Sequence, residues 1–246
     1  ILKGVDVILV DPCRPGTLAP IAEEAKKKGI PLLTGAGHVK GEVCFVGSDN
    51  YVGGRMVGLF AAKWLSEHIR GRRVKVAILQ STRYPIPNLR IPGYIEGLRE
   101  RCSDAEIYMR DTEANKADAM AKMEDILTEV GRVDATFGIN GPTSLGALAA
   151  CETKYGAKET CCCGLDLDPD EIATLRSPDH PQYMASAAQF PYWISEMLIR
   201  LGIKATWGEE LPVRVWGPYR MATRDTVDEV LAYYPPIPEY AEIDGK

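Results

Sequence analysis

The feature that most constrains the fold is a repeated alternation of buried strands and helices along the chain. Short, nearly unbroken apolar runs, such as residues 5–10, 74–79 and 161–165, are each followed by a polar turn and a helical segment. Such runs are typical of strands that are buried on both faces of a parallel sheet. Their alternation with helices indicates βαβ units. We expect about nine strands, which suit two lobes better than one open sheet. The sequence therefore predicts an α/β fold with parallel sheets.

Polar side chains stand directly after three of the predicted strands. Asn140, Asp166 and Gln189 each follow an apolar run without an intervening residue. In open α/β sheets, ligands bind in the crevice outside the carboxyl ends of the strands. Three hydrogen-bonding side chains at such ends therefore predict a site for a small polar ligand.

Composition and motifs exclude several classes of function. A net charge of -5 argues against a nucleic-acid partner, which would require a basic surface. No run of about 18 apolar residues is present, so we expect no membrane insertion. The chain contains neither a Gly-x-Ser-x-Gly nor a His-Glu-x-x-His motif, and Gly35–Gly37 lacks the third glycine of a dinucleotide-binding loop. The sequence therefore predicts a protein without enzymatic activity and without a cofactor.

Cysteine is frequent but is not spaced for metal binding. Three of the seven cysteines are consecutive, Cys161 to Cys163, which matches neither a zinc spacing nor a disulfide framework. In a buried strand, Cys161 and Cys163 face one side and Cys162 faces the other, so we expect all three in the core. The abundance of cysteine favours a reducing compartment.

Three aspartates, at positions 166, 168 and 170, resemble the start of a calcium-binding loop. The sixth position of such a loop is Glu171 instead of glycine, and the twelfth is Ser177 instead of glutamate, so no metal site is predicted. Asp168 precedes Pro169 and is instead predicted to cap a helix.

Several segments of the chain form a pattern by their order and spacing, namely residues 4–9, 25–31, 46–54, 90–94, 145–147 and 164–166 together with Asn140 and Gln189. In this pattern the chain resembles a known family, the type I periplasmic binding proteins. The resemblance is strongest to the ribose-type sugar-binding components of ABC importers and covers residues 1 to about 230. The resemblance implies two Rossmann-like lobes joined by a hinge, with a ligand clamped between them.

The resemblance also implies the lobe boundaries. Residues 1–48 and 190–212 are expected to form the first lobe, and residues 49–189 and 213–234 the second. Residues 235–246 are expected to be a wrapped or disordered tail. Family members usually carry one more βαβα unit before the matching region, so the sequence is interpreted as a fragment with an incomplete first lobe.

Five residues carry the implied ligand contacts, namely Tyr84, Arg90, Asn140, Asp166 and Gln189. Arg90 matches an arginine that donates a fork of hydrogen bonds to a sugar, and Asp166 matches an aspartate that accepts from its hydroxyls. Asn140 matches an asparagine that contacts a hydroxyl, and Gln189 matches a ligand-binding hinge residue. Planar groups of this kind pair with polyols at two points.

One departure from the ribose-type pattern concerns the ligand. Ala36-Gly37 stands where these relatives carry Asp-Arg, so a sugar other than ribose, or a related polyol, is expected. Tyr84 and Arg83, in an unusual polar loop, could supply replacement contacts.

Each residue also has a structural alternative. Asn140 could satisfy only turn backbone, Asp166 could be a loop carboxylate, and Arg90 a surface residue at a helix start. Gln189 could be a simple hinge hydrogen bonder, and Tyr84 could only cover the rim of the cleft.

Two functional hypotheses follow. The first is a periplasmic or extracytoplasmic solute-binding protein that closes on a sugar or polyol and delivers it to ABC permease subunits. The Asp49–Gly54 pattern favours it. The alternative is the cytoplasmic ligand-sensing domain of a lactose-repressor-like transcription regulator, which the cysteines favour. A signal peptide or a helix-turn-helix upstream of Ile1 would separate the two. An α/β enzyme with a small-molecule site is the third and least favoured interpretation.

Overall fold

The computed structural model describes residues 1–12, 14–156 and 159–243, which divide into two compact units. The first unit is made of the described parts of Ile1–Asp49, Phe190–Pro218 and Tyr234–Lys246. The second unit is made of the described parts of Asn50–Gln189 and Tyr219–Tyr233. Each unit contains one sheet of its own.

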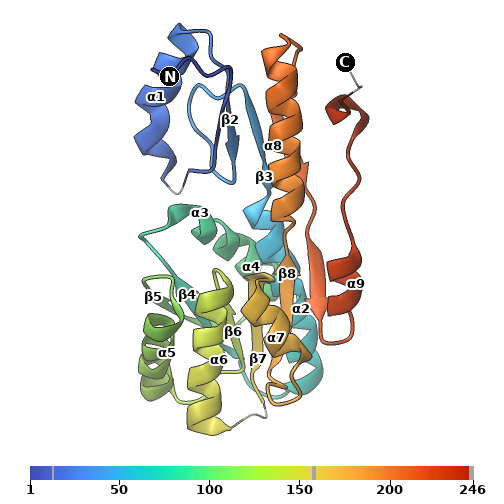
Figure 1. The fold of residues 1–246 in the computed structure, drawn as a ribbon. Helices are drawn as coiled ribbons and strands as arrows, with labels where there is room; N and C mark the ends of the chain where they lie inside the picture. Colours follow the sequence, from blue (N-terminus) through green and yellow to red (C-terminus); the bar gives the residue numbers. More distant parts are fainter. Residues whose placement is uncertain (13, 157–158, 244–246) are drawn as a thin grey trace. The chain divides into compact units, whose positions relative to one another are not determined.

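A four-stranded parallel sheet forms the centre of the first unit. Its strand order is β1 (Ile8–Val10), β2 (Leu32–Gly35), β3 (Cys44–Ser48) and β9 (Arg214–Gly217). Helix α1 (Ala19–Lys27), which follows a 3-10 turn (Pro15–Leu18), and helix α8 (Pro191–Thr206) lie on opposite sides of β2 (Figure 1). The strand alternation explains this arrangement, because Leu32 packs in a cluster with α1 whereas its neighbour Leu33 packs in the cluster of α8.

A six-stranded sheet forms the centre of the second unit. Its order is β10 (Arg220–Thr223), β8 (Tyr183–Ala188), β7 (Cys161–Asp166), β6 (Ala135–Gly138), β4 (Lys75–Gln80) and β5 (Glu106–Asp111). All neighbouring strands are parallel except β10, which runs antiparallel to β8.

Helices cover both faces of this second sheet. One face packs against α2 (Asn50–His68) and α4 (Arg90–Arg99), and the other against α5 (Lys116–Val130) and α6 (Gly141–Tyr155) (Figure 1). Three shorter helices complete the unit, namely α3 (Pro85–Asn88), α7 (Pro169–Arg176) and α9 (Val227–Ala232). The α/β architecture with parallel sheets is the predicted one.

Glycines bring α2 and α4 into backbone contact. A side chain on Gly54 would overlap the carbonyl group of Arg90, and one on Gly58 would overlap that of Tyr94. Gly93 on α4 approaches the α2 backbone in the same way. Close packing therefore explains these glycines, and it lays the start of α4 beside the start of α2.

The cysteine triplet lies in the core as predicted. Cys161 and Cys163 pack with α2 and α4, whereas Cys162 packs in a different cluster with residues of α6 and α7. The six cysteines of the described residues are all buried and free. Cys13 lies outside the described residues.

The expected lobe boundaries differ from the observed units, most of all at residues 213–218. Residues 213–218 were expected in the second lobe, but β9 pairs in parallel with β3 and so belongs to the first unit. Only residues 219–233 of this region belong to the second unit. Within the expected tail, a 3-10 turn (Glu239–Ala241) packs on α8, with Ala241 buried.

Candidate functional site

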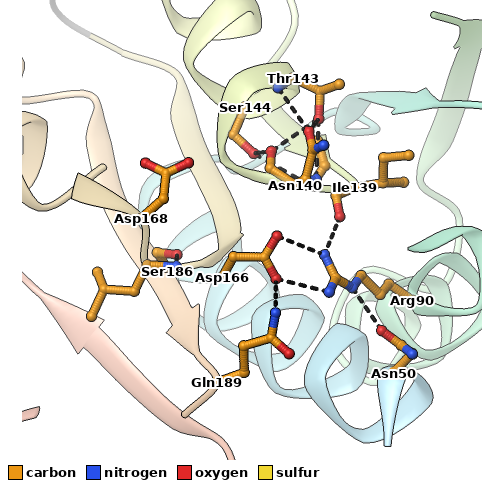
Figure 2. A network of polar contacts seen from close by, with 12 residues as sticks. Asn50, Arg90, Ile139, Asn140, Thr143, Ser144, Asp166, Asp168, Ser186 and Gln189 are labelled. Atoms are coloured by element: carbon orange, nitrogen blue, oxygen red, sulfur yellow. Dashed lines mark hydrogen bonds and ion pairs between the residues drawn. The ribbon is translucent and has the colours of Figure 1, made fainter. Parts of the chain in front are cut away.

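An ion pair between Arg90 and Asp166 forms the centre of the candidate site. Asp166 ends β7 and Arg90 begins α4, and both belong to the second unit. Arg90 Nη2 lies 2.8 Å from Asp166 Oδ1, and Nη1 lies 3.2 Å from Oδ2 (Figure 2). The Arg90 side chain is 6% exposed and the Asp166 side chain 24% exposed. Such a two-point pair fixes the relative orientation of both planar groups.

Two further acceptors hold the guanidinium group of Arg90. Its Nε donates to Asn50 Oδ1 over 2.8 Å, and its Nη1 also donates to the carbonyl oxygen of Ile139 (Figure 2). Burial lowers the pKa of Arg90, but the charge and hydrogen bonds of Asp166 together with nearby Tyr219 and Glu171 outweigh this effect, and the pKa is raised overall. The guanidinium group therefore stays charged. Within the described residues, four of its five N–H groups have an acceptor.

Gln189 joins the same pair from the end of β8. Its Nε2 donates to Asp166 Oδ1 over 2.7 Å (Figure 2). Burial raises the pKa of Asp166, although Arg90 and Gln189 both favour its charged form.

The backbone at Asp166 is unusual. Asp166 has a φ of 116° and Leu167 a φ of 56°, a backbone region that residues with side chains rarely adopt. An unusual backbone at a carboxylate with these partners is typical of a functional site.

Asn140 lies next to this network but has a structural task of its own. Its side-chain Oδ1 accepts from the backbone N–H of Thr143 over 3.0 Å and caps helix α6. Its Nδ2 lies 3.5 Å from the carbonyl oxygen of Ala114. Because the preceding carbonyl, that of Ile139, accepts from Arg90, Asn140 lies beside the ion pair (Figure 2). Capping is thus observed, whereas a ligand contact by Asn140 stays a prediction.

Tyr84 and Arg83 are engaged with another part of the second unit. Arg83 forms an ion pair of 2.6 Å with Glu113, and its guanidinium group lies 5.6 Å from the centre of the Tyr84 ring. The loop expected at residues 80–89 contains α3, and Thr82 ties it to Asp111 at the end of β5. No hydrogen bond in the described chain joins Tyr84 or Arg83 to the Arg90–Asp166 pair. Their contribution to ligand binding stays a prediction.

Asp168 caps helix α7 as the sequence predicts. Its Oδ1 accepts from the backbone N–H groups of Asp170 and Glu171 over 3.0 and 2.9 Å.

Within residues 1–12, 14–156 and 159–243, no cluster of three or more histidine, cysteine or acidic side chains is arranged to hold a metal ion. In the same residues, no helix combines the length and apolarity that a membrane span requires.

Two groups of the site were not predicted from the sequence, namely Asn50 and the carbonyl of Ile139. Asn50 was considered only as part of the Asp49–Gly54 pattern, yet it accepts a hydrogen bond from Arg90. The glycines of α2 carried a signal for this role, because the contact of Gly54 with Arg90 brings the first turn of α2 beside α4.

Comparison with known sequences identifies the family. A family model described as "Periplasmic binding protein domain" matches residues 1–210, and the chain belongs to this family. The "Ribose import binding protein" of Bacillus subtilis (strain 168) is 25% identical over 235 residues, which are 91% of this chain and 70% of that protein. The protein with the same name in Haemophilus influenzae is 27% identical over 229 residues, which are 87% and 70% of the two chains. At the level of the family, the chain is a solute-binding protein and not an enzyme.

Comparison with solved structures supports the same fold. A periplasmic solute-binding protein of an ABC transporter from Actinobacillus succinogenes, with bound D-allose, has a TM-score of 0.83 and 21% identity. The match covers 93% of this chain and 80% of that one. A solute-binding protein from Bacillus halodurans with bound myo-inositol also has a TM-score of 0.83 and 21% identity, covering 95% and 79%. The predicted periplasmic binding protein fold is thus confirmed.

Proposed function

We propose that this protein binds a sugar or a related polyol and delivers it to an ABC transporter. The observation that carries the proposal is the Arg90–Asp166 pair, joined by Gln189 at the carboxyl ends of β7 and β8. Parallel α/β sheets bind their ligands at this edge. The names of the relatives support the solute-binding class over the transcription-regulator alternative.

The chemistry of the pair fits a polyol. A carboxylate offers about four acceptor sites, and Arg90 and Gln189 occupy three of those on Asp166. The site that is left, on Oδ2 of the partly exposed side chain, suits a ligand hydroxyl. The remaining N–H of Arg90 suits a hydroxyl or ring oxygen. A donor and an acceptor fixed in one plane match the neighbouring hydroxyls of a polyol.

The ligand class is proposed more broadly than ribose. The relatives that are similar in sequence are named for ribose import, whereas similar structures contain D-allose and myo-inositol. Ala36-Gly37 replaces the Asp-Arg pair expected for the ribose type. We therefore infer a monosaccharide or cyclic polyol, with ABC permease subunits as partners and a periplasmic or extracytoplasmic location.

Calorimetric titration with D-ribose, D-allose, D-galactose and myo-inositol tests the proposal. At least one of them is expected to bind the wild-type protein. The Asp166→Asn variant is expected to bind it about 10- to 100-fold more weakly, since hydrogen bonds to charged groups are worth about 1.5–3 kcal/mol.

The matched control is Asp134→Asn, which alters a buried carboxylate that pairs with Arg72 at the amino end of β6. This variant is expected to lose stability but to keep the affinity of the wild type. The proposal is wrong if no sugar or polyol binds, or if Asp166→Asn binds as tightly as the wild type.

A further inference from the structure

A second carboxylate of the second unit, Glu171, is fully buried within a hydrogen-bond network. Its Oε1 accepts from the hydroxyl of Tyr183 over 2.5 Å and from that of Ser186 over 2.7 Å. Its Oε2 accepts from the backbone N–H of Asp168 over 2.9 Å. A buried carboxylate is costly unless such donors compensate it. Its place in the protein therefore needs an explanation.

The network ends on the turn that carries Asp166. The backbone N–H of Leu167 donates to Ser186 Oγ over 3.2 Å, and Ser186 in turn donates to Glu171. The next N–H, of Asp168, donates to Glu171 directly. Glu171 thus holds the two backbone groups that follow Asp166. These are the positions where the chain has its unusual positive φ angles, at Asp166 and Leu167. Such angles persist where the surrounding structure imposes them.

Glycines make room for this carboxylate on two neighbouring elements. A side chain on Gly164 of β7 would overlap the Tyr183 hydroxyl and Glu171 Oε1. A side chain on Gly141, the first residue of α6, would overlap the carboxylates of Asp168 and Glu171. Both glycines have φ angles that other residues adopt readily, so space, and not backbone conformation, explains them. The sequences of both elements are thus adapted to Glu171.

We propose that Glu171 is a positioning residue, which holds the turn after β7 so that Asp166 faces Arg90 and the ligand. Glu171 does not touch the ligand itself, because it is fully buried. This inference rests on the proposed function for its effect on binding. Its effect on the Arg90–Asp166 pair does not require a ligand.

Nuclear magnetic resonance of the ligand-free protein tests the inference directly. The readouts are the amide exchange rates of Leu167 and Asp168 and the side-chain N–H signals of Arg90. Ser186→Ala removes the acceptor of Leu167, and Glu171→Leu removes all three hydrogen bonds of the carboxylate. Both variants are expected to speed amide exchange at least about tenfold at Leu167 or Asp168 and to shift or broaden the Arg90 signals.

Two controls separate positioning from a general loss of stability. Glu171→Gln keeps an acceptor for Tyr183 and Ser186, so its Arg90 signals are expected to stay closer to those of the wild type than the signals of Glu171→Leu do. Asp134→Asn removes an equally buried carboxylate at the opposite edge of the sheet and is expected to leave these signals unchanged. If Glu171→Leu does not fold, Ser186→Ala still gives the result.

Titration of the same variants with the best-binding compound among D-ribose, D-allose, D-galactose and myo-inositol extends the test. Glu171→Leu and Ser186→Ala are expected to weaken binding by about tenfold, the effect of losing one well-placed hydrogen bond. Unchanged Arg90 signals and unchanged amide exchange in both variants would overturn the inference. If the wild type binds none of these compounds, the proposed function fails, but the ligand-free measurements still decide the role of Glu171.

Discussion

At the scale of single residues, the side chains predicted to bind a ligand also bind one another. Asp166, Arg90 and Gln189 form one hydrogen-bonded group, and Asn140 caps the adjacent helix. A ligand would therefore meet side chains whose orientation is already fixed. Pre-organisation of this kind reduces the conformational entropy that binding costs. The structural and ligand-binding interpretations of these residues are thus compatible.

Two substitutions of Asn140 separate its two tasks. Asn140→Asp keeps the oxygen that caps α6 but loses the amide donor, so stability should be retained and sugar affinity should fall about tenfold. Asn140→Ala loses both groups and should also destabilise the protein by about 1 kcal/mol. Urea unfolding and calorimetric titration measure the two effects. Wild-type affinity in Asn140→Asp would leave Asn140 with the capping role alone.

The site could be predicted in part because strand ends are visible in the sequence. Asp166 and Gln189 directly follow apolar runs, and the geometry of parallel sheets brings such positions to one edge. The other two partners of Arg90, Asn50 and the carbonyl of Ile139, could not be found in this way. Asn50 reaches Arg90 only because glycines allow α2 and α4 to touch, which is a tertiary contact between distant segments.

At the scale of elements, the contact between α2 and α4 fixes the position of Arg90. In Gly54→Ala, alanine favours a helix by about 1 kcal/mol, but its side chain would overlap the Arg90 carbonyl. Since overpacking costs about 1–3 kcal/mol, we expect a net loss of stability together with weaker sugar binding. Urea unfolding and titration measure both effects.

Gly16→Ala is the control for this substitution, because no atom lies within 4 Å of the added side chain. It should change neither stability nor affinity appreciably. Equal behaviour of the two variants would contradict the proposed role of the helix contact.

Glu171 makes the stability of the second unit depend on pH. Burial raises its pKa from 4.5 to about 8, although Tyr183, the backbone of Asp168 and Ser186 favour the charged form. Between these two values the unfolded chain releases the proton while the folded protein keeps it. The free energy of unfolding should therefore fall as the pH rises, by up to about 1.4 kcal/mol per pH unit, and level off above about pH 8.

Urea unfolding between about pH 5 and pH 9 measures this dependence. Glu171→Gln removes the titrating group and should remove this contribution to the slope. An unchanged slope in the variant would show that Glu171 does not titrate in this range.

Most elements could be predicted because their strands are apolar and their helices have clear ends. The strand β10 was missed, because Arg220–Thr223 has no apolar run and is a strand only through its pairing with β8. The residues of β9 were expected in the second lobe, but the strand pairs with β3 in the first unit. Neither error could be avoided from the sequence alone, since strand pairing depends on tertiary context.

At the scale of the whole molecule, both units are assembled from segments that are distant in the sequence. The first unit combines the beginning of the chain with two segments from its last quarter. The chain spans about 70% of the length of the curated relatives that it matches.

Cysteines contribute to the cores of both units, since Cys44 packs in the first and the triplet in the second.

Burial should protect these thiols from reagents in solution. It raises the pKa of Cys44 to about 11, with Glu42 adding to the effect. The pKa of Cys161 is raised by its hydrogen bond with Cys163 and by burial, and that of Cys162 by its hydrogen bond with Cys151 and by burial. In a Cys13→Ser variant, Ellman's reagent should therefore react with the remaining thiols only after unfolding in guanidinium. Fast labelling of any of these thiols in the native protein would contradict the buried positions.

A crystal structure of the protein with its best-binding sugar or polyol would test the central claim most directly. The account predicts ligand hydroxyl oxygens at hydrogen-bonding distance, about 2.6–3.2 Å, from the carboxylate of Asp166 and the guanidinium group of Arg90. A ligand bound elsewhere, with Arg90 and Asp166 bonded only to protein groups, would contradict it.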